Sequence, residues 1–190
     1  MLKLTPKVKY YSLAITVFTI SGIVSNLRED WYLFMPGISF GTALAFMLIY
    51  TSKERFLNLA MASLFVVPVI YLCVEFYMYV GIFLETTFRK LQLYQKITAL
   101  ITGEEDLMIA LHCAFCGSVL LACFYRFSGL SNRSGWFVIL LGTTAGIFFI
   151  IPITNAPDLP QILQTYPFII WQCTVGCLIL SGLPTDNNKA

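Results

Sequence analysis

Residues 56–84 read FLNLAMASLFVVPVIYLCVEFYMYVGIFL, and Glu75 is the one charged side chain in this run. The hydrocarbon core of a bilayer is about 30 Å thick, and about 20 apolar residues in helical conformation cross it. A helix also satisfies its own backbone hydrogen bonds, as lipid surroundings require. The run therefore predicts an unusually long transmembrane helix.

Five further apolar runs of similar character occur on either side of it, at Tyr10–Ser25, Trp31–Tyr50, Leu107–Tyr125, Trp136–Ile153 and Ile162–Gly182. The first of them follows a basic start, as in a secretory signal, but its length favours an anchor helix. We therefore predict an all-α polytopic membrane protein. It would form one domain over residues 1–190, a bundle of six transmembrane helices with spans at about 10–25, 31–50, 56–84, 107–125, 136–153 and 162–182.

The composition supports a membrane protein. Of the 190 residues, 58% are hydrophobic and only 12% are charged, whereas soluble domains carry roughly 25% charged residues. These values exclude a soluble globular domain and a disordered chain. The net charge of +2 is too small for the basic surface that nucleic acids require. We expect the lipid bilayer, and no nucleic acid, as a partner.

Lysine and arginine residues indicate the orientation, because they concentrate on the cytoplasmic side of membrane proteins. With a cytoplasmic N-terminus, the inside segments hold Lys3, Lys7, Lys9, Lys53, Arg55, Arg126, Arg133 and Lys189, and the outside segments hold Arg28, Arg89, Lys90 and Lys96. Both termini are therefore predicted to be cytoplasmic. Three of the outside cations lie between Glu85 and Asp106, where we predict a short interfacial helix between the third and fourth spans.

Small residues at four-residue spacing predict faces at which membrane helices approach closely. Three spans carry them: Gly37, Gly41 and Ala45 in the second, Ala110, Ala114, Ser118 and Ala122 in the fourth, and Gly142 and Gly146 in the fifth.

Glu75 is the clearest candidate functional residue, because a carboxylate inside a membrane span is costly unless it has a function or a partner. Tyr71 and Tyr79 share its helix face at four-residue spacing. His112, the single histidine, is expected in the same outer half of the membrane. The two groups would coordinate a ligand or handle a proton; alternatively, the carboxylate only locks helix positions through hydrogen bonds.

The sixth span adds polar groups to the outer and middle parts of the predicted bundle. Gln164, Trp171 and Gln172 lie in it, together with Pro167, which is expected to kink the helix. Such features are typical of a concave, outward-facing pocket. The predicted ligand-binding set is Tyr71, Glu75, Tyr79, His112, Gln164, Trp171 and Gln172.

All six cysteines fall inside predicted spans, at Cys73, Cys113, Cys116, Cys123, Cys173 and Cys177. The Cys113-x-x-Cys116 pair suggests a thiol oxidoreductase, but the predicted loops contain no second cysteine pair. The six cysteines are better explained as small apolar residues that are buried within the helices. A zinc or haem site at His112, Cys113 and Cys116 is disfavoured, because one histidine leaves too few ligands for bis-imidazole haem and the thiols would need to ionise in lipid. We therefore expect no metal and no cofactor.

The leading expectation is a membrane component that binds or transports a small hydrophobic or amphipathic molecule, with a partner subunit or as a homo-oligomer. In length, number of spans and cytoplasmic termini, the chain resembles the substrate-binding subunits of energy-coupling-factor vitamin transporters, without a shared sequence motif. Two alternatives remain at this point. One is an intramembrane enzyme acting on a lipid or isoprenoid, with Glu75 and His112 as acid and base. The other is an assembly or accessory subunit.

Overall fold

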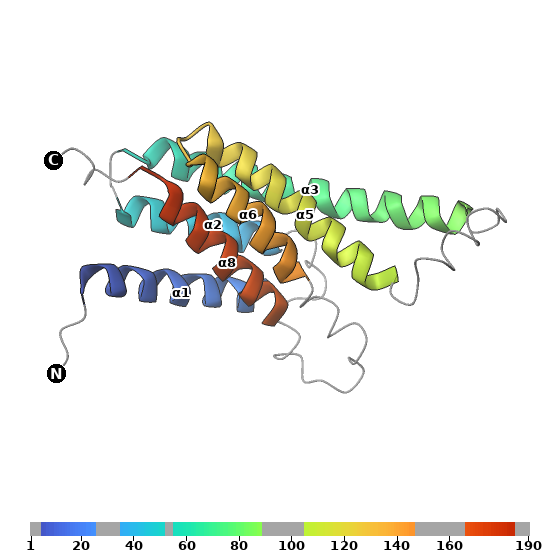
Figure 1. Ribbon diagram of the computed structural model, residues 1–190, viewed down its shortest axis with the longest axis horizontal. Helices are drawn as coiled ribbons and strands as arrows, with labels where there is room; N and C mark the ends of the chain where they lie inside the picture. The colour runs from blue at the N-terminus through green and yellow to red at the C-terminus, as the bar shows by residue number, and fades with distance from the viewer. Residues whose placement is uncertain (1–4, 26–34, 52–54, 89–104, 147–165, 185–190) are drawn as a thin grey trace.

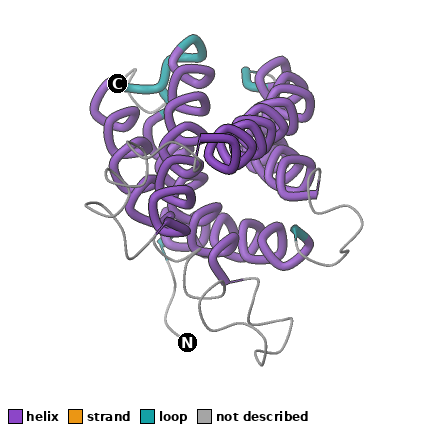
Figure 2. Tube along the Cα trace, turned by 90° about the vertical axis from the view of Figure 1, so that its right-hand side faces the viewer, coloured by secondary structure: helices purple, strands orange, loops and turns teal. Residues whose placement is uncertain are grey.

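The computed structural model describes residues 5–25, 35–51, 55–88, 105–146 and 166–184, with the backbone alone at residues 78, 81–88, 105–112 and 166. Within these ranges the chain is helical and contains no strand, which confirms the all-α prediction (Figures 1 and 2). The six helices are α1 (Pro6–Val24), α2 (Met35–Thr51), α3 (Leu57–Phe88), α5 (Glu105–Arg126), α6 (Asn132–Ala145) and α8 (Tyr166–Gly182).

The six helices form a closed ring in chain order. Each packs against the one before and the one after it, and α8 closes the ring by packing against α1. α8 also touches α2 and α5 across the ring. The distal half of α3 and the start of α5 extend beyond the other helices at the right of Figure 1.

Hydrogen bonds show that successive helices run in alternating directions. The Tyr10 and Thr51 hydroxyls, 3.0 Å apart, join the start of α1 to the end of α2. The Ser131 amide donates to the Gly182 carbonyl over 3.1 Å and joins the start of α6 to the end of α8. α1 therefore starts, and α8 ends, at the same end of the ring (Figure 1).

The helices begin earlier than the predicted spans at two places. α1 begins at Pro6 rather than at Tyr10, because proline suits the first helical position, where no hydrogen bond is lost. α6 begins at Asn132 rather than at Trp136, because the Ser131 side chain accepts from the Ser134 amide and caps the helix. The predicted interfacial helix falls largely on residues 89–104, outside the described residues.

One described segment, Leu57–Tyr77, is long and apolar enough to cross a membrane, with a mean hydropathy of 2.2. Three other helices carry shorter apolar stretches, at Met35–Thr51, Cys113–Arg126 and Pro167–Gly182. The six-span arrangement therefore stays a prediction.

The small residues predicted in the second span do bring two helices together. A Cβ atom at Gly37 would lie 2.7 Å from the Pro68 Cα, and one at Gly41 would lie 2.8 Å from the Ser63 carbonyl oxygen. α2 therefore packs backbone to backbone on α3. Pro68 lies inside α3, directly at this contact.

The predicted faces of the fourth and fifth spans also meet. Gly142 of α6 packs on the side chain of Ser118 in α5, and Ala114 and Ala122 on the same face of α5 are buried. The prediction that these residues form packing faces is confirmed for the members whose side chains are described.

Replacing Gly22 tests a close backbone contact between α1 and α8. A Cβ there would lie 2.7 Å from the Ile169 Cα and 2.8 Å from its nitrogen, and backbone atoms cannot move aside cheaply. We expect Gly22→Ala to lower the free energy of unfolding by about 1–3 kcal/mol, measured as thermal unfolding of the purified protein. Gly117→Ala is the control, because its Cβ would meet Trp171 at an ordinary 3.6 Å. Equal stability of the two variants would contradict this packing.

Candidate functional site

A buried hydrogen-bond network joins α8 to α1. Gln172 of α8 is completely buried. Its Oε1 accepts from the Ser21 hydroxyl over 2.6 Å, and its Nε2 donates to the Ser25 Oγ over 3.0 Å. The Ser25 and Ser39 hydroxyls, 2.8 Å apart, extend the network to α2. Both ends of the carboxamide therefore have partners on α1, and we call these four residues the Gln172 network.

An aromatic cluster lies beside this network. The ring of Phe40 in α2 lies 5.6 Å from that of Trp171, 6.4 Å from that of Tyr71 and 5.7 Å from that of Phe18. The Tyr71 and Trp171 rings meet edge to face at 5.8 Å, a favourable arrangement. Side chains from α1, α2, α3 and α8 thus converge inside the ring of helices.

Polar atoms without partners border the aromatic cluster. The Tyr71 hydroxyl, the Trp171 indole nitrogen and the Glu75 Oε2 oxygen are buried and have no hydrogen-bond partner among the described residues. The Tyr71 hydroxyl lies beside the Gln172 side chain, but the two do not meet in hydrogen-bonding geometry. Burying such groups without a hydrogen bond costs free energy. Two donors and one acceptor in this region are therefore available to a bound molecule.

Glu75 lies one helical turn beyond Tyr71 on α3 and is half-buried. It is close enough to interact electrostatically with Tyr71 and, across the α3–α5 contact, with Cys113. Gly117, one turn after Cys113, faces Trp171 and Val74. Helices α3, α5 and α8 therefore all border the unpartnered atoms, and we call Tyr71, Glu75 and Trp171 the α3–α8 cluster.

Four of the seven predicted ligand-binding residues lie together in the structure: Tyr71, Glu75, Trp171 and Gln172. Tyr79 is two turns beyond Tyr71 on α3, and 44% of it is exposed. His112 lies on α5, but its side chain is outside the described part, as is all of Gln164. The predicted pairing of Glu75 with His112 therefore stays a prediction.

Sequence reasoning missed the residues that hold this region in place. Ser21, Ser25, Phe18 and Phe40 were not predicted to belong to any site. The two serines are four residues apart and interrupt an apolar run, so their spacing marks one face of α1. That spacing gives no sign of which distant side chain they meet.

Pro167 and the Cys113-x-x-Cys116 pair lie within the described residues. Pro167 follows Tyr166, the first described residue of α8. The residues that precede Tyr166 lie outside the described part of the chain, so the predicted kink stays a prediction. Cys113 and Cys116 are unpaired thiols. Among the described residues, no three histidine, cysteine or acidic side chains gather as a metal site would need.

Comparison of the chain with protein-family models, curated proteins and solved structures found no match. The function is therefore argued from the geometry of this region.

Ser21 and Ser118 provide a matched test of the Gln172 network, because both are buried serines on helices. Ser21 donates to Gln172, whereas the Ser118 hydroxyl has no partner in the part of the chain that the structure describes. We expect Ser21→Ala to lower the free energy of unfolding by about 1–2 kcal/mol, since it leaves the Gln172 oxygen unsatisfied. Ser118→Ala should be neutral or slightly stabilising. Thermal unfolding of both variants measures the difference, and a reversed order would contradict the network.

Proposed function

We propose that this protein is a multi-pass integral membrane protein. The apolar character of its surface supports the proposal. Only 22% of the most apolar stretch of α3 is buried inside the structure, whereas the core helix of a soluble protein is mostly covered. Phe65 and Phe76 of α3 are 69% and 71% exposed, and Leu140 of α6 is 62% exposed. Apolar surface of this extent requires lipid or a protein partner to cover it.

The charges of the described residues support a single orientation. The end of the ring where α1 begins and α8 ends carries Lys7, Lys9, Arg55, Arg126 and Arg133, and no acidic residue within the described ranges. The opposite end carries Glu85, Glu105 and Asp106. Because cytoplasmic segments are enriched in lysine and arginine, we place the cationic end, and with it both termini, in the cytoplasm.

Thiol labelling tests this orientation. In a protein whose six cysteines are replaced by alanine, we expect Phe127→Cys, at a position 93% exposed at the cationic end, to react with a membrane-impermeant reagent only in inverted vesicles. Glu105→Cys, at the opposite end, should react only in right-side-out vesicles. Labelling of both positions from the same side would contradict the arrangement.

We further propose that the protein binds a small amphipathic molecule at the α3–α8 cluster, as a binding or transport component. The observation that supports this most strongly is the set of buried, unpartnered polar atoms on Tyr71, Glu75 and Trp171. Elsewhere in the same core, Gln172 satisfies both ends of its side chain. A polar core built only to lock the helices would be expected to complete its hydrogen bonds in both places.

The side chains suggest the chemistry of the ligand. The Glu75 carboxylate suits a hydrogen-bond donor or a cationic group, and the Tyr71 and Trp171 rings suit an apolar or cationic body. The tyrosine hydroxyl and the indole N–H would donate to an acceptor on the same molecule. No glycine-rich phosphate loop occurs in the 190 residues, so active transport would require a partner subunit or a coupled ion.

Replacing Glu75 by Gln tests the proposal. Gln keeps the size of the side chain but removes its charge, and we expect Glu75→Gln to lose a co-purifying small molecule while retaining the fold. The measurement is native mass spectrometry of protein released gently from the membrane, with thermal unfolding as the check on folding. Loss of about tenfold in occupancy corresponds to about 1.4 kcal/mol, a modest value for a hydrogen bond to a charged group.

Glu85→Gln is the matched control, because it removes the same charge ten residues further along α3 and should leave occupancy unchanged. Equal occupancy in the wild type and in Glu75→Gln would contradict a ligand at Glu75. In that case the Glu75 carboxylate would be better explained as a residue that fixes helix positions through hydrogen bonds.

A further inference from the structure

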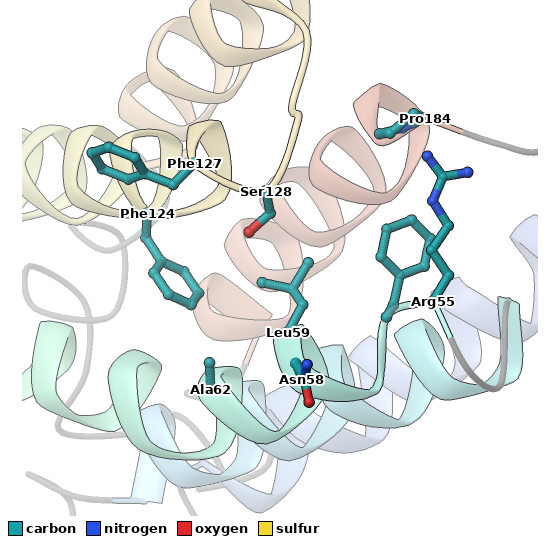
Figure 3. A pocket seen from close by; sticks show the side chains of 9 residues that line it. Arg55, Asn58, Leu59, Ala62, Phe124, Phe127, Ser128 and Pro184 are labelled. Atoms are coloured by element: carbon teal, nitrogen blue, oxygen red, sulfur yellow. The ribbon is translucent and has the colours of Figure 1, made fainter.

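A hollow lies at the cationic end of the ring, far along α3 from Glu75. It has a volume of about 540 Å³ and is formed where α3 begins, α5 ends and α8 ends (Figure 3). Its lining residues are Arg55, Phe56, Asn58, Leu59, Ala62, Phe124, Phe127, Ser128 and Pro184. The α3–α8 cluster contributes no residue to it.

The hollow has an apolar part and a polar part. Leu59, Ala62 and Phe124 face one another across the gap between α3 and the end of α5 (Figure 3). The Arg55 side chain reaches toward Pro184 on the other side of Leu59, and its guanidinium lies 5.5 Å from the centre of the Phe56 ring. A molecule filling the hollow would therefore meet an arginine at one end and aliphatic and aromatic groups at the other.

The surroundings of the hollow match the boundary between lipid and water. Phe127 at its rim is 93% exposed, and Trp136, one turn into α6, is 72% exposed. Exposed aromatic residues at the ends of apolar helices are typical of the membrane interface. With the proposed orientation, this rim lies on the cytoplasmic side.

The charge at this end is positive. Arg126 and Arg133 lie near Arg55 in the same group of helix ends, and Arg126 donates to the Leu130 carbonyl over 2.8 Å. In the sequence, the adjoining segments add Lys3, Lys53 and Lys189 against Glu54 and Asp186. The excess of cations attracts anionic groups.

From this combination we infer that the hollow binds an anionic phospholipid of the cytoplasmic leaflet. Its phosphate would lie at Arg55, and an acyl chain would lie along Leu59, Ala62 and Phe124. The inference rests on the membrane location proposed above, but not on the ligand of the α3–α8 cluster.

A free phosphate compound would bind Arg55 as a lipid headgroup does, but it would make no contact with the apolar side chains of Leu59, Ala62 and Phe124, which we call the apolar wall. The lining contains three aromatic side chains and the aliphatic side chains of Leu59 and Ala62. Arg55 is the single cation of the lining. Arginine binds phosphate through paired N–H donors, and burial of each methylene group of a lipid chain adds about 0.8 kcal/mol. The apolar wall therefore favours a lipid.

The test uses the full chain in mixed micelles that contain equal amounts of phosphatidylglycerol and phosphatidylcholine, followed by native mass spectrometry. We expect the wild type to retain phosphatidylglycerol in preference to phosphatidylcholine. Arg55→Gln should reduce retained phosphatidylglycerol by about fivefold, the effect of losing one cation near an anionic lipid. Ala62→Phe, which fills the apolar part, should reduce retention while Arg55 is still present.

Arg133→Gln is the matched control. It removes a cation from the same end, but Arg133 lies 5.7 Å from the Phe137 ring and does not line the hollow. It should retain phosphatidylglycerol as the wild type does. Glu75→Gln should also retain it, which separates this site from the α3–α8 cluster.

Three results would overturn the inference. The first is equal retention of the two lipids by the wild type. The second is an equal loss in Arg55→Gln and Arg133→Gln, which would indicate diffuse attraction to the cationic end. The third is displacement of the bound lipid by millimolar glycerol phosphate in the same micelles, which would indicate a site for the headgroup alone.

Discussion

The hydrogen bonds of Gln172 are the constraint on which the core depends. A carboxamide placed in apolar surroundings costs several kcal/mol unless both of its ends have partners, and Ser21 and Ser25 supply those partners from α1. These two hydrogen bonds fix the rotation of α8 about its axis and its position along α1. That position closes the ring of helices, and it also sets Trp171, the preceding residue, against Phe40 and Tyr71.

The core therefore contains two kinds of polar group at nearly the same place. The Gln172 network is complete within the protein, so it fixes geometry and has little left to offer a ligand. The α3–α8 cluster is held by that geometry, but it keeps donors and an acceptor that have no partner among the described residues. A rigid frame beside unused hydrogen-bonding groups is the arrangement that a preorganised binding site requires.

The sequence is informative where a signal is local. Apolar runs located the six helices of the described residues, and four-residue spacing placed Tyr71 beside Glu75 on α3. Helix starts were less well predicted, because a window that averages hydropathy overlooks single capping residues such as Pro6 and Ser131. Contacts between distant helices could not be predicted from the sequence, because a serine in an apolar run gives the same sequence pattern whichever residue it contacts. The hollow at the cationic end was missed for the same reason, because three separate helix ends build it.

The closure of the ring has a consequence for biosynthesis. Ser21 and Gln172 are separated by 151 positions in the chain, and a chain leaves the ribosome from its N-terminus. Ser21 and Ser25 must therefore wait, without their final partner, until α8 has been made. During that interval α1 and α6 lack the helix against which both of them pack. A chain truncated before α8 would leave the same two serines without this partner permanently.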